Sequence, residues 1–175
     1  IHQTISAHNG TRTYAFICYN HIMITIRKAR INEVKKLQDL NDDAFSSNPE
    51  FDPDLVLDWA QSDLGKNYFT NTINDPKDLL LVAEDGNKLI GYIGASPKEI
   101  DYRKSKYVEV DNLGVAKTYR RKGVATMLME KCINWAKEQG YQKLYLTSYF
   151  KNASAITFYK QNGFSEINIS LEKKL

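Results

Sequence analysis

The sequence predicts an α/β fold, built on a mixed and mostly antiparallel sheet of six to seven strands with helices on both faces. One observation is an apolar run at 79–83 that a turn at 85–87 connects to a returning run at 88–95, the pattern of an antiparallel hairpin. A second is a strand, a helix and another strand over 107–147. An antiparallel half followed by a strand–helix–strand unit favours a mixed sheet covered on both sides.

The first half of the chain is expected to form a strand and two helical segments. Apolar residues alternate with polar ones around Ile24, which predicts a strand. Apolar residues at helical spacing predict the first helix over 31–45. The sequence Ser-Ser-Asn-Pro at 46–49 ends it, and Pro53 then opens a second helical segment that runs through Leu64.

The second half follows the hairpin with a polar loop at 97–106. Its remaining elements are a strand at 107–116, a helix from the basic turn to Gln139, a strand at 144–147, a helix at 152–161 and a last alternating strand at 164–171. Gly140 and Gly163 stand where the two helices are expected to end. No internal repeat or linker divides this part of the chain.

The length of 175 residues suits one domain, expected over 23–175. Residues 1–22 lack helical or strand periodicity, and Met23 begins a run that reads like a natural start. We therefore interpret 1–22 as a non-native or flexible extension. The alternative is an arm that packs on the domain or on a partner. A positively charged start with an apolar core, as in a signal peptide, is not present.

Composition and charge are those of an ordinary globular protein. The net charge of +3 fits an anionic small ligand as well as it fits nucleic acid, so it does not decide between them. No apolar run approaches the roughly 18 residues that span a bilayer. With two cysteines, Cys18 and Cys132, a reduced protein in the cytoplasm is expected. The three histidines, all before Met23, lack metal-ligand spacing, and no metal site is expected.

A short basic turn separates the strand at 107–116 from the helix after it. A helix N-terminus offers unpaired backbone N–H groups and a partial positive charge, which together bind anions. Basic side chains are unfavourable there unless an anion balances them, which argues against a merely solvated turn. We expect a phosphorylated ligand bound by the N–H groups of Arg121, Lys122, Gly123, Val124, Ala125 and Thr126, with Arg120 adding charge.

Three motifs stand together around this turn. They are Leu113-Gly114-Val115, Arg120-x-x-Gly123-x-Ala125, and Asn152-x-x-Ala155-x-x-x-Tyr159-x-x-x-Gly163-Phe164. In these motifs the sequence resembles the GNAT superfamily of N-acetyltransferases, and the resemblance extends over 23–175, strand order included. The usual turn has Gly where Arg121 and Ala125 stand here.

The resemblance implies the GNAT fold and transfer of an acetyl group from acetyl-CoA, as co-substrate, to an amine. It implies that the turn holds the pyrophosphate of coenzyme A. Leu113 and Val115 would present backbone groups to the pantetheine amides and polarise the thioester carbonyl. Asn152 would contact the cofactor arm, although an N-cap alone also explains it.

Three side chains are candidates for proton transfer. The resemblance implies that Tyr159 protonates the departing thiolate, and a phenol of pKa about 10 suits a thiolate of pKa about 8.5. A half-buried core tyrosine is the alternative. Glu109 matches the place of the catalytic glutamate in the histone-acetylating branch of the superfamily. Asp111, two residues on, or a water chain is its rival as general base, and a β-bulge near Asn112 would re-aim both side chains. The amine is expected to attack directly in a ternary complex.

The acceptor amine, a small molecule or a protein, is not identified by the sequence. It is expected to contact 31–64, the loop at 97–106 and the C-terminal strand, with Ser148 and Tyr149 also lining its pocket. Part of this region is rich in aspartate, with Asp39, Asp42, Asp43, Asp52, Asp54 and Asp58. These residues would form an acidic rim that suits a cationic acceptor, although a solvated helix face also explains them.

Two other functions fit parts of the sequence. One is an acyl-CoA-binding module without catalysis. The other is a nucleic-acid-binding protein, disfavoured because the basic residues gather at one turn. Neither a membrane nor a nucleic acid is expected as a partner. The resemblance also allows a homodimer.

Overall fold

The computed structural model describes residues 24–175, so the extension expected at 1–22 lies outside the described residues. Its strands are β1 (Ile24–Lys28), β2 (Leu79–Asp85), β3 (Lys88–Lys98), β4 (Tyr107–Val115) and β5 (Lys143–Tyr145). Its helices are α1 (Val34–Phe45), α2 (Asp63–Asn74), α3 (Val124–Glu138) and α4 (Ala153–Gln161), with 3-10 turns η1 (Ile31–Glu33), η2 (Asn48–Glu50), η3 (Trp59–Gln61) and η4 (Lys117–Tyr119).

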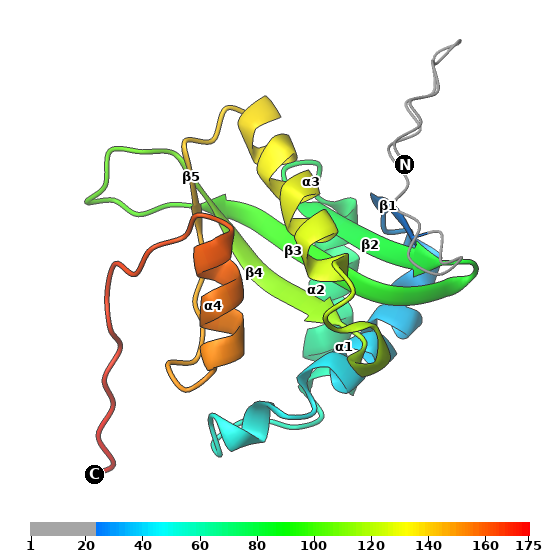
Figure 1. Ribbon diagram of the computed structural model, residues 1–175, viewed down its shortest axis with the longest axis horizontal. Helices are drawn as coiled ribbons and strands as arrows, with labels where there is room; N and C mark the ends of the chain where they lie inside the picture. Colours follow the sequence, from blue (N-terminus) through cyan, green and yellow to red (C-terminus); the bar gives the residue numbers. More distant parts are fainter. Residues whose placement is uncertain (1–23) are drawn as a thin grey trace.

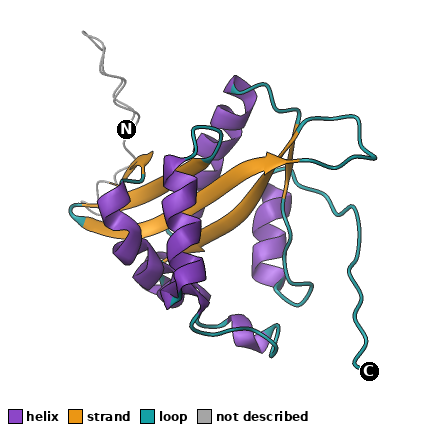
Figure 2. Ribbon diagram, turned by 180° about the vertical axis from the view of Figure 1, so that it is seen from behind, coloured by secondary structure: helices purple, strands orange, loops and turns teal. Residues whose placement is uncertain are grey.

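The strands form one sheet in the order β1-β2-β3-β4-β5, antiparallel except for the parallel pair β4 and β5. Helix α3 crosses one face of the sheet, and α1 and α2 cover the other (Figures 1 and 2). The predicted mixed sheet with helices on both faces is therefore confirmed.

Two apolar clusters fill the space on either side of the sheet. Leu79 and Leu81 of β2 pack toward Leu128 and Cys132 of α3. The intervening Leu80 packs with residues of α1 and α2 on the opposite face. This alternation follows from the strand period of two, and burial on both faces explains why β2 is apolar throughout.

The expected strand at 164–171 does not form, so within residues 24–175 the sheet has five strands instead of six or seven. The apolar side chains of this segment face solvent, with exposed fractions of 51% for Ile167 and 76% for Ile169. The edge strand β5 has only three residues, so it offers little backbone for a further strand to pair with. Alternation predicts a strand only where a paired neighbour and a core face are available.

The second helix also differs from the prediction. Residues 51–58 are turns and irregular chain, and α2 begins at Asp63 instead of near Pro53. The Ser62 hydroxyl accepts a hydrogen bond from the Gly65 N–H at 3.4 Å and so caps the helix. This cap, and not the upstream proline, sets the start of α2. The irregular stretch is left to line the groove described below.

The sheet opens between β4 and β5. Pairing between them covers only Tyr107 to Glu109, and the chain after Tyr145 continues as an irregular loop. On its β3 side, β4 carries a bulge, because Gly94 pairs with Asn112 while Ala95 pairs with Val110. Asp111 is the extra residue, so the bulge expected near Asn112 is present one residue earlier.

Candidate active site

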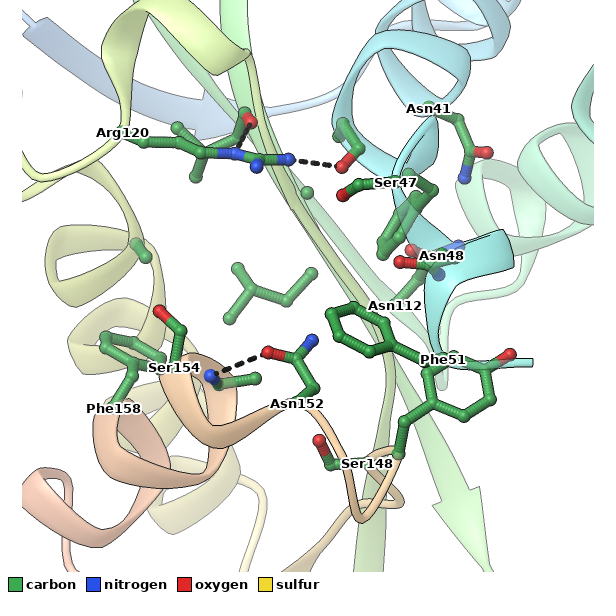
Figure 3. A pocket seen from close by; sticks show the side chains of 18 of the residues that line it. Asn41, Ser47, Asn48, Phe51, Asn112, Arg120, Ser148, Asn152, Ser154 and Phe158 are labelled. Atoms are coloured by element: carbon green, nitrogen blue, oxygen red, sulfur yellow. Dashed lines mark hydrogen bonds between the residues drawn. The ribbon is translucent and has the colours of Figure 1, made fainter.

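A groove of about 1520 Å³ lies where the sheet opens. Its walls are the chain after α1, the second half of β4, the turn before α3, and the β5–α4 loop with the start of α4 (Figure 3). Every predicted site residue lines it except Glu109 and Lys122. The fold thus brings segments separated by more than 100 residues to one cavity.

The turn before α3 leaves its backbone donors free. Gly123 is the N-cap with φ of 81°, a left-handed conformation that glycine adopts without strain. The first bond of the helix ladder runs from the Met127 N–H to the Gly123 carbonyl at 3.0 Å. The N–H groups of Val124, Ala125 and Thr126 therefore have no acceptor within the helix, and no side chain caps it. This arrangement fits a phosphate group.

Arg121 shares the left-handed conformation, with φ of 61°. It is the only non-glycine residue with positive φ among those described. This is one of the two positions where the resemblance expects glycine, so the side chain is accommodated at the expense of backbone strain. The Arg121 and Lys122 side chains are exposed, and the Lys122 ammonium lies 5.0 Å from the centre of the Tyr119 ring.

The Arg120 side chain binds the protein itself. Its Nη2 donates to the Ala44 carbonyl at 2.5 Å and its Nε to the Val115 carbonyl at 3.4 Å (Figure 3). The Lys117 N–H nearby donates to the Asp43 carboxylate at 2.9 Å. Arg120 therefore joins the turn to the end of α1. Its positive charge still lies beside the helix N-terminus.

The end of β4 presents backbone to the groove. Leu113 and Val115 are half-buried and pack toward the α3 core cluster. A Cβ on Gly114 would lie 2.7 Å from the Tyr92 ring and 3.1 Å from Ala44. Close packing against α1 and Tyr92 therefore accounts for this glycine.

Asp111 is held in place by two hydroxyl groups. Tyr68 Oη of α2 donates to its Oδ1 at 2.6 Å, and Ser96 Oγ of β3 donates to its Oδ2 at 3.1 Å. Burial raises the pKa of Asp111, and these hydrogen bonds lower it. Burial and the Asp111 charge raise the pKa of Tyr68 well above its usual value, so its hydroxyl remains protonated.

Glu109 has a different environment. Its Oε2 accepts from the Lys98 ammonium at 2.7 Å, and the Lys98 ammonium lies 5.3 Å from the centre of the Tyr145 ring. Glu109 does not line the groove, whereas Asp111 does. Of the two candidate bases, the structure brings Asp111 to the cavity and gives Glu109 a cationic partner beside it.

Helix α4 supplies the remaining predicted residues. Asn152 Oδ1 accepts from the Ala155 N–H at 3.1 Å, so Asn152 is the N-cap (Figure 3). Two turns on, Tyr159 packs edge-on against Phe158 and Phe164, with ring centres 5.4 and 5.8 Å apart. Burial raises the pKa of Tyr159, which keeps the phenol protonated. Phe158 packs against the core and also lines the groove.

The end of the groove opposite the turn carries an aromatic pair. The rings of Phe51, after η2, and Tyr149, in the β5–α4 loop, stack with centres 6.0 Å apart and planes 28° apart. Ser148 and Tyr149 both line the groove, as expected. The sequence did not single out Phe51, Tyr68 or Ser96. Tyr68 belongs to the site only because it donates a hydrogen bond to Asp111, which lies 43 positions away in the sequence.

Two classes of feature are absent from the described residues. Between residues 24 and 175, no three His, Cys, Asp or Glu side chains are grouped as they would be to hold a metal. In that same part of the chain, no helix has the length and apolar character needed to cross a membrane.

Residues 35–164 match the sequence model of the acetyltransferase (GNAT) family. Streptothricin acetyltransferase A from Bacillus subtilis is 33% identical over 118 residues, which are 62% of this chain and 65% of that protein. Human N-acetyltransferase 8 is 28% identical over 113 residues, 65% of this chain and 48% of the relative. The chain thus matches 65% of the length of the first relative and about half, 48%, of the second.

Among solved structures, the PaiA N-acetyltransferase from Thermoplasma acidophilum in complex with coenzyme A superposes with a TM-score of 0.72. The alignment covers 84% of this chain and 92% of that one at 22% identity. At this identity the likeness concerns the fold, which is the arrangement of sheet and helices described above.

Proposed function

Because this chain belongs to the GNAT acetyltransferase family, we propose that it transfers an acetyl group from acetyl-CoA to a primary amine. One observation carries the proposal: the uncapped N-terminus of α3, Asp111 and Tyr159 line the same groove. An anion site, a base and an acid are the parts that acyl transfer from a phosphorylated thioester requires. The N-acetyltransferase names of the relatives support nitrogen as the acceptor atom.

The turn before α3 is assigned to the pyrophosphate of coenzyme A. The N–H groups of 121–126 donate to it, and the helix dipole with the charges of Arg120, Arg121 and Lys122 attracts it. Acetyl-CoA, when bound, supplies an activated carbonyl carbon. Leu113 and Val115 offer backbone groups to its pantetheine arm, and the Asn152 side-chain amide retains N–H donors beyond its capping bond.

Asp111 is assigned as the proton acceptor for the attacking amine. Partial loss of water around its carboxylate raises the pKa of Asp111, although the residue keeps an exposed surface in the groove. That surface allows contact with an ammonium group directly or through water. Glu109 remains the alternative, but its carboxylate must first leave Lys98. Tyr159 is assigned as the acid that protonates the departing thiolate, and the amine attacks directly in a ternary complex.

A thiol-release assay with acetyl-CoA and a panel of amines tests the proposal. We expect release of coenzyme A that depends on amine and yields an acetamide detectable by mass spectrometry. Calorimetry with acetyl-CoA alone measures cofactor binding separately from acetyl transfer. Binding of acetyl-CoA without turnover of any amine would indicate an acyl-CoA-binding module without catalysis. Absence of binding would overturn the assignment of the turn. A cytoplasmic location and a homodimer stay predictions.

A further inference from the structure

The charges along the groove are separated by sign. The charged residues that line it are Asp42, Asp111, Arg120 and Arg121, within the described chain. Both arginines belong to the turn assigned to the pyrophosphate. The chain between α1 and α2, residues 46–62, contains no Lys or Arg and carries Glu50, Asp52, Asp54 and Asp58. The groove therefore favours an anion at the turn and a cation at the opposite end.

Phe51 lies at that opposite end (Figure 3), and Tyr149 of the β5–α4 loop stacks on its ring. Asp52 follows Phe51, and its charge contributes with burial to raising the pKa of Tyr149. Its Oδ1 accepts from the Asp54 N–H at 3.0 Å, which fixes the carboxylate beside the rings. Aromatic faces next to a carboxylate form a favourable environment for an ammonium group.

The chain after Phe51 adds apolar side chains to the groove. Leu55, Val56 and Leu57 follow Phe51 in sequence and line the same cavity. Val56 and Leu57 are 68% and 73% exposed, so they have apolar surface available to a ligand. Such surface suits methylene groups better than a hydroxylated or charged linker, because its burial removes apolar area from water.

We propose that the acceptor is an aliphatic diamine. One amine lies at Asp111, where it loses its proton and attacks the thioester, and the second remains an ammonium ion between Asp52 and the rings of Phe51 and Tyr149. The hydrocarbon spacer lies along Leu55, Val56 and Leu57. This inference rests on the proposed acetyl transfer and names its substrate. An α-amino acid fits less well, since no cationic side chain among the described lining residues is available at this end for its carboxylate.

The test compares kcat/KM for an aliphatic diamine, such as 1,5-diaminopentane, with that for the monoamine of equal chain length, 1-aminopentane. We expect the diamine to be favoured by roughly tenfold or more, the scale of one charge-assisted cation–π site. Asp52→Asn keeps the acceptor for the Asp54 N–H but removes the charge, and should bring the ratio near one. Phe51→Leu should lower the ratio in the same direction. Neither acid lines the groove itself, but the Asp52 charge acts on Tyr149 and the Glu50 charge is not among the causes of that shift. Glu50→Gln, at an exposed acid of the same segment, is therefore the matched control and should leave the ratio unchanged.

Equal kcat/KM for the two amines would overturn the diamine inference and leave acetyl transfer standing. Preference for an amine that bears a carboxylate, or for a hydroxylated aminosugar over the diamine, would overturn it as well. Calorimetric titration of the coenzyme A complex with the same two amines gives a readout that does not need turnover. Tighter binding of the diamine, lost in Asp52→Asn, is the expected result, and equal binding contradicts the inference. Retained coenzyme A affinity shows that each variant is folded.

Discussion

The Tyr68 hydroxyl donates a hydrogen bond of 2.6 Å to Oδ1 of Asp111, joining α2 to the bulge of β4. Gly94 makes room for this pair on β3. A Cβ at Gly94 would lie 2.3 Å from Tyr68 Oη and 2.8 Å from Asp111 Oδ1. The bulge, the glycine and the tyrosine thus together present one carboxylate to the groove, and the first two predictions concern this pair.

Asp111→Asn should lower kcat/KM by about 10²- to 10³-fold at neutral pH, because the amide cannot accept the proton of the amine. Its affinity for acetyl-CoA should stay unchanged, since the phosphates are bound at the turn. Glu109→Gln is the comparison variant, expected to lose less than about tenfold because Glu109 faces Lys98 outside the groove. Steady-state kinetics and calorimetry measure both. The reverse order of losses would make Glu109 the base.

Tyr68→Phe should shift the acid limb of the pH profile of kcat/KM to higher pH. The Tyr68 hydrogen bond stabilises the charged form of Asp111 and so lowers its pKa. Removing this bond raises the pKa of Asp111, so a higher pH is needed to form the carboxylate. Burial and the Glu109 charge raise the pKa of Asp111, whereas the hydrogen bonds from Tyr68 and Ser96 lower it. Burial and Glu109 are unchanged in the variant. An unchanged acid limb would mean that Asp111 does not limit the rate there.

Tyr159→Phe should lower kcat by about 10²-fold or more while leaving the KM for acetyl-CoA close to that of the wild type, because the thiolate loses its proton donor. The ring and its packing against Phe158 and Phe164 are retained, so the free energy of unfolding should change little. Phe158→Leu, on the neighbouring position, is the control for packing alone. Equal losses in the two variants would leave Tyr159 with a structural role only.

Arg121→Gly should stabilise the protein and weaken cofactor binding. Glycine adopts φ of 61° without the steric clash that a Cβ causes. The greater conformational entropy of glycine in the unfolded chain offsets part of this gain, so the free energy of unfolding should rise by about 1 kcal/mol. The lost cation should reduce acetyl-CoA affinity several-fold, by about 0.5–1 kcal/mol. Lys122→Ala removes a neighbouring charge at a residue without positive φ, so it should lose affinity without gaining stability. Thermal unfolding and calorimetry separate the two effects, and an Arg121→Gly variant that melts lower would contradict the strain argument.

The sequence alone was sufficient for features whose cause is local. The hairpin at Gly86 and the Asn152 cap of α4 both depend on the conformation or hydrogen bonding of a few adjacent residues. The same signals predicted the anion-binding turn and the sheet with helices on both faces. They could not distinguish Ser62 from Pro53 as the start of α2, since both residues are typical of helix N-termini.

Only the tertiary structure gives the two carboxylates different environments. Glu109 and Asp111 are two positions apart, yet Lys98 binds one and Tyr68 the other, across 11 and 43 residues. The aromatic pair of Phe51 and Tyr149, and the lack of a strand at 164–171, likewise depend on neighbours far along the chain. Local sequence sets backbone preference, whereas the partner and burial of a side chain exist only once distant segments have packed together.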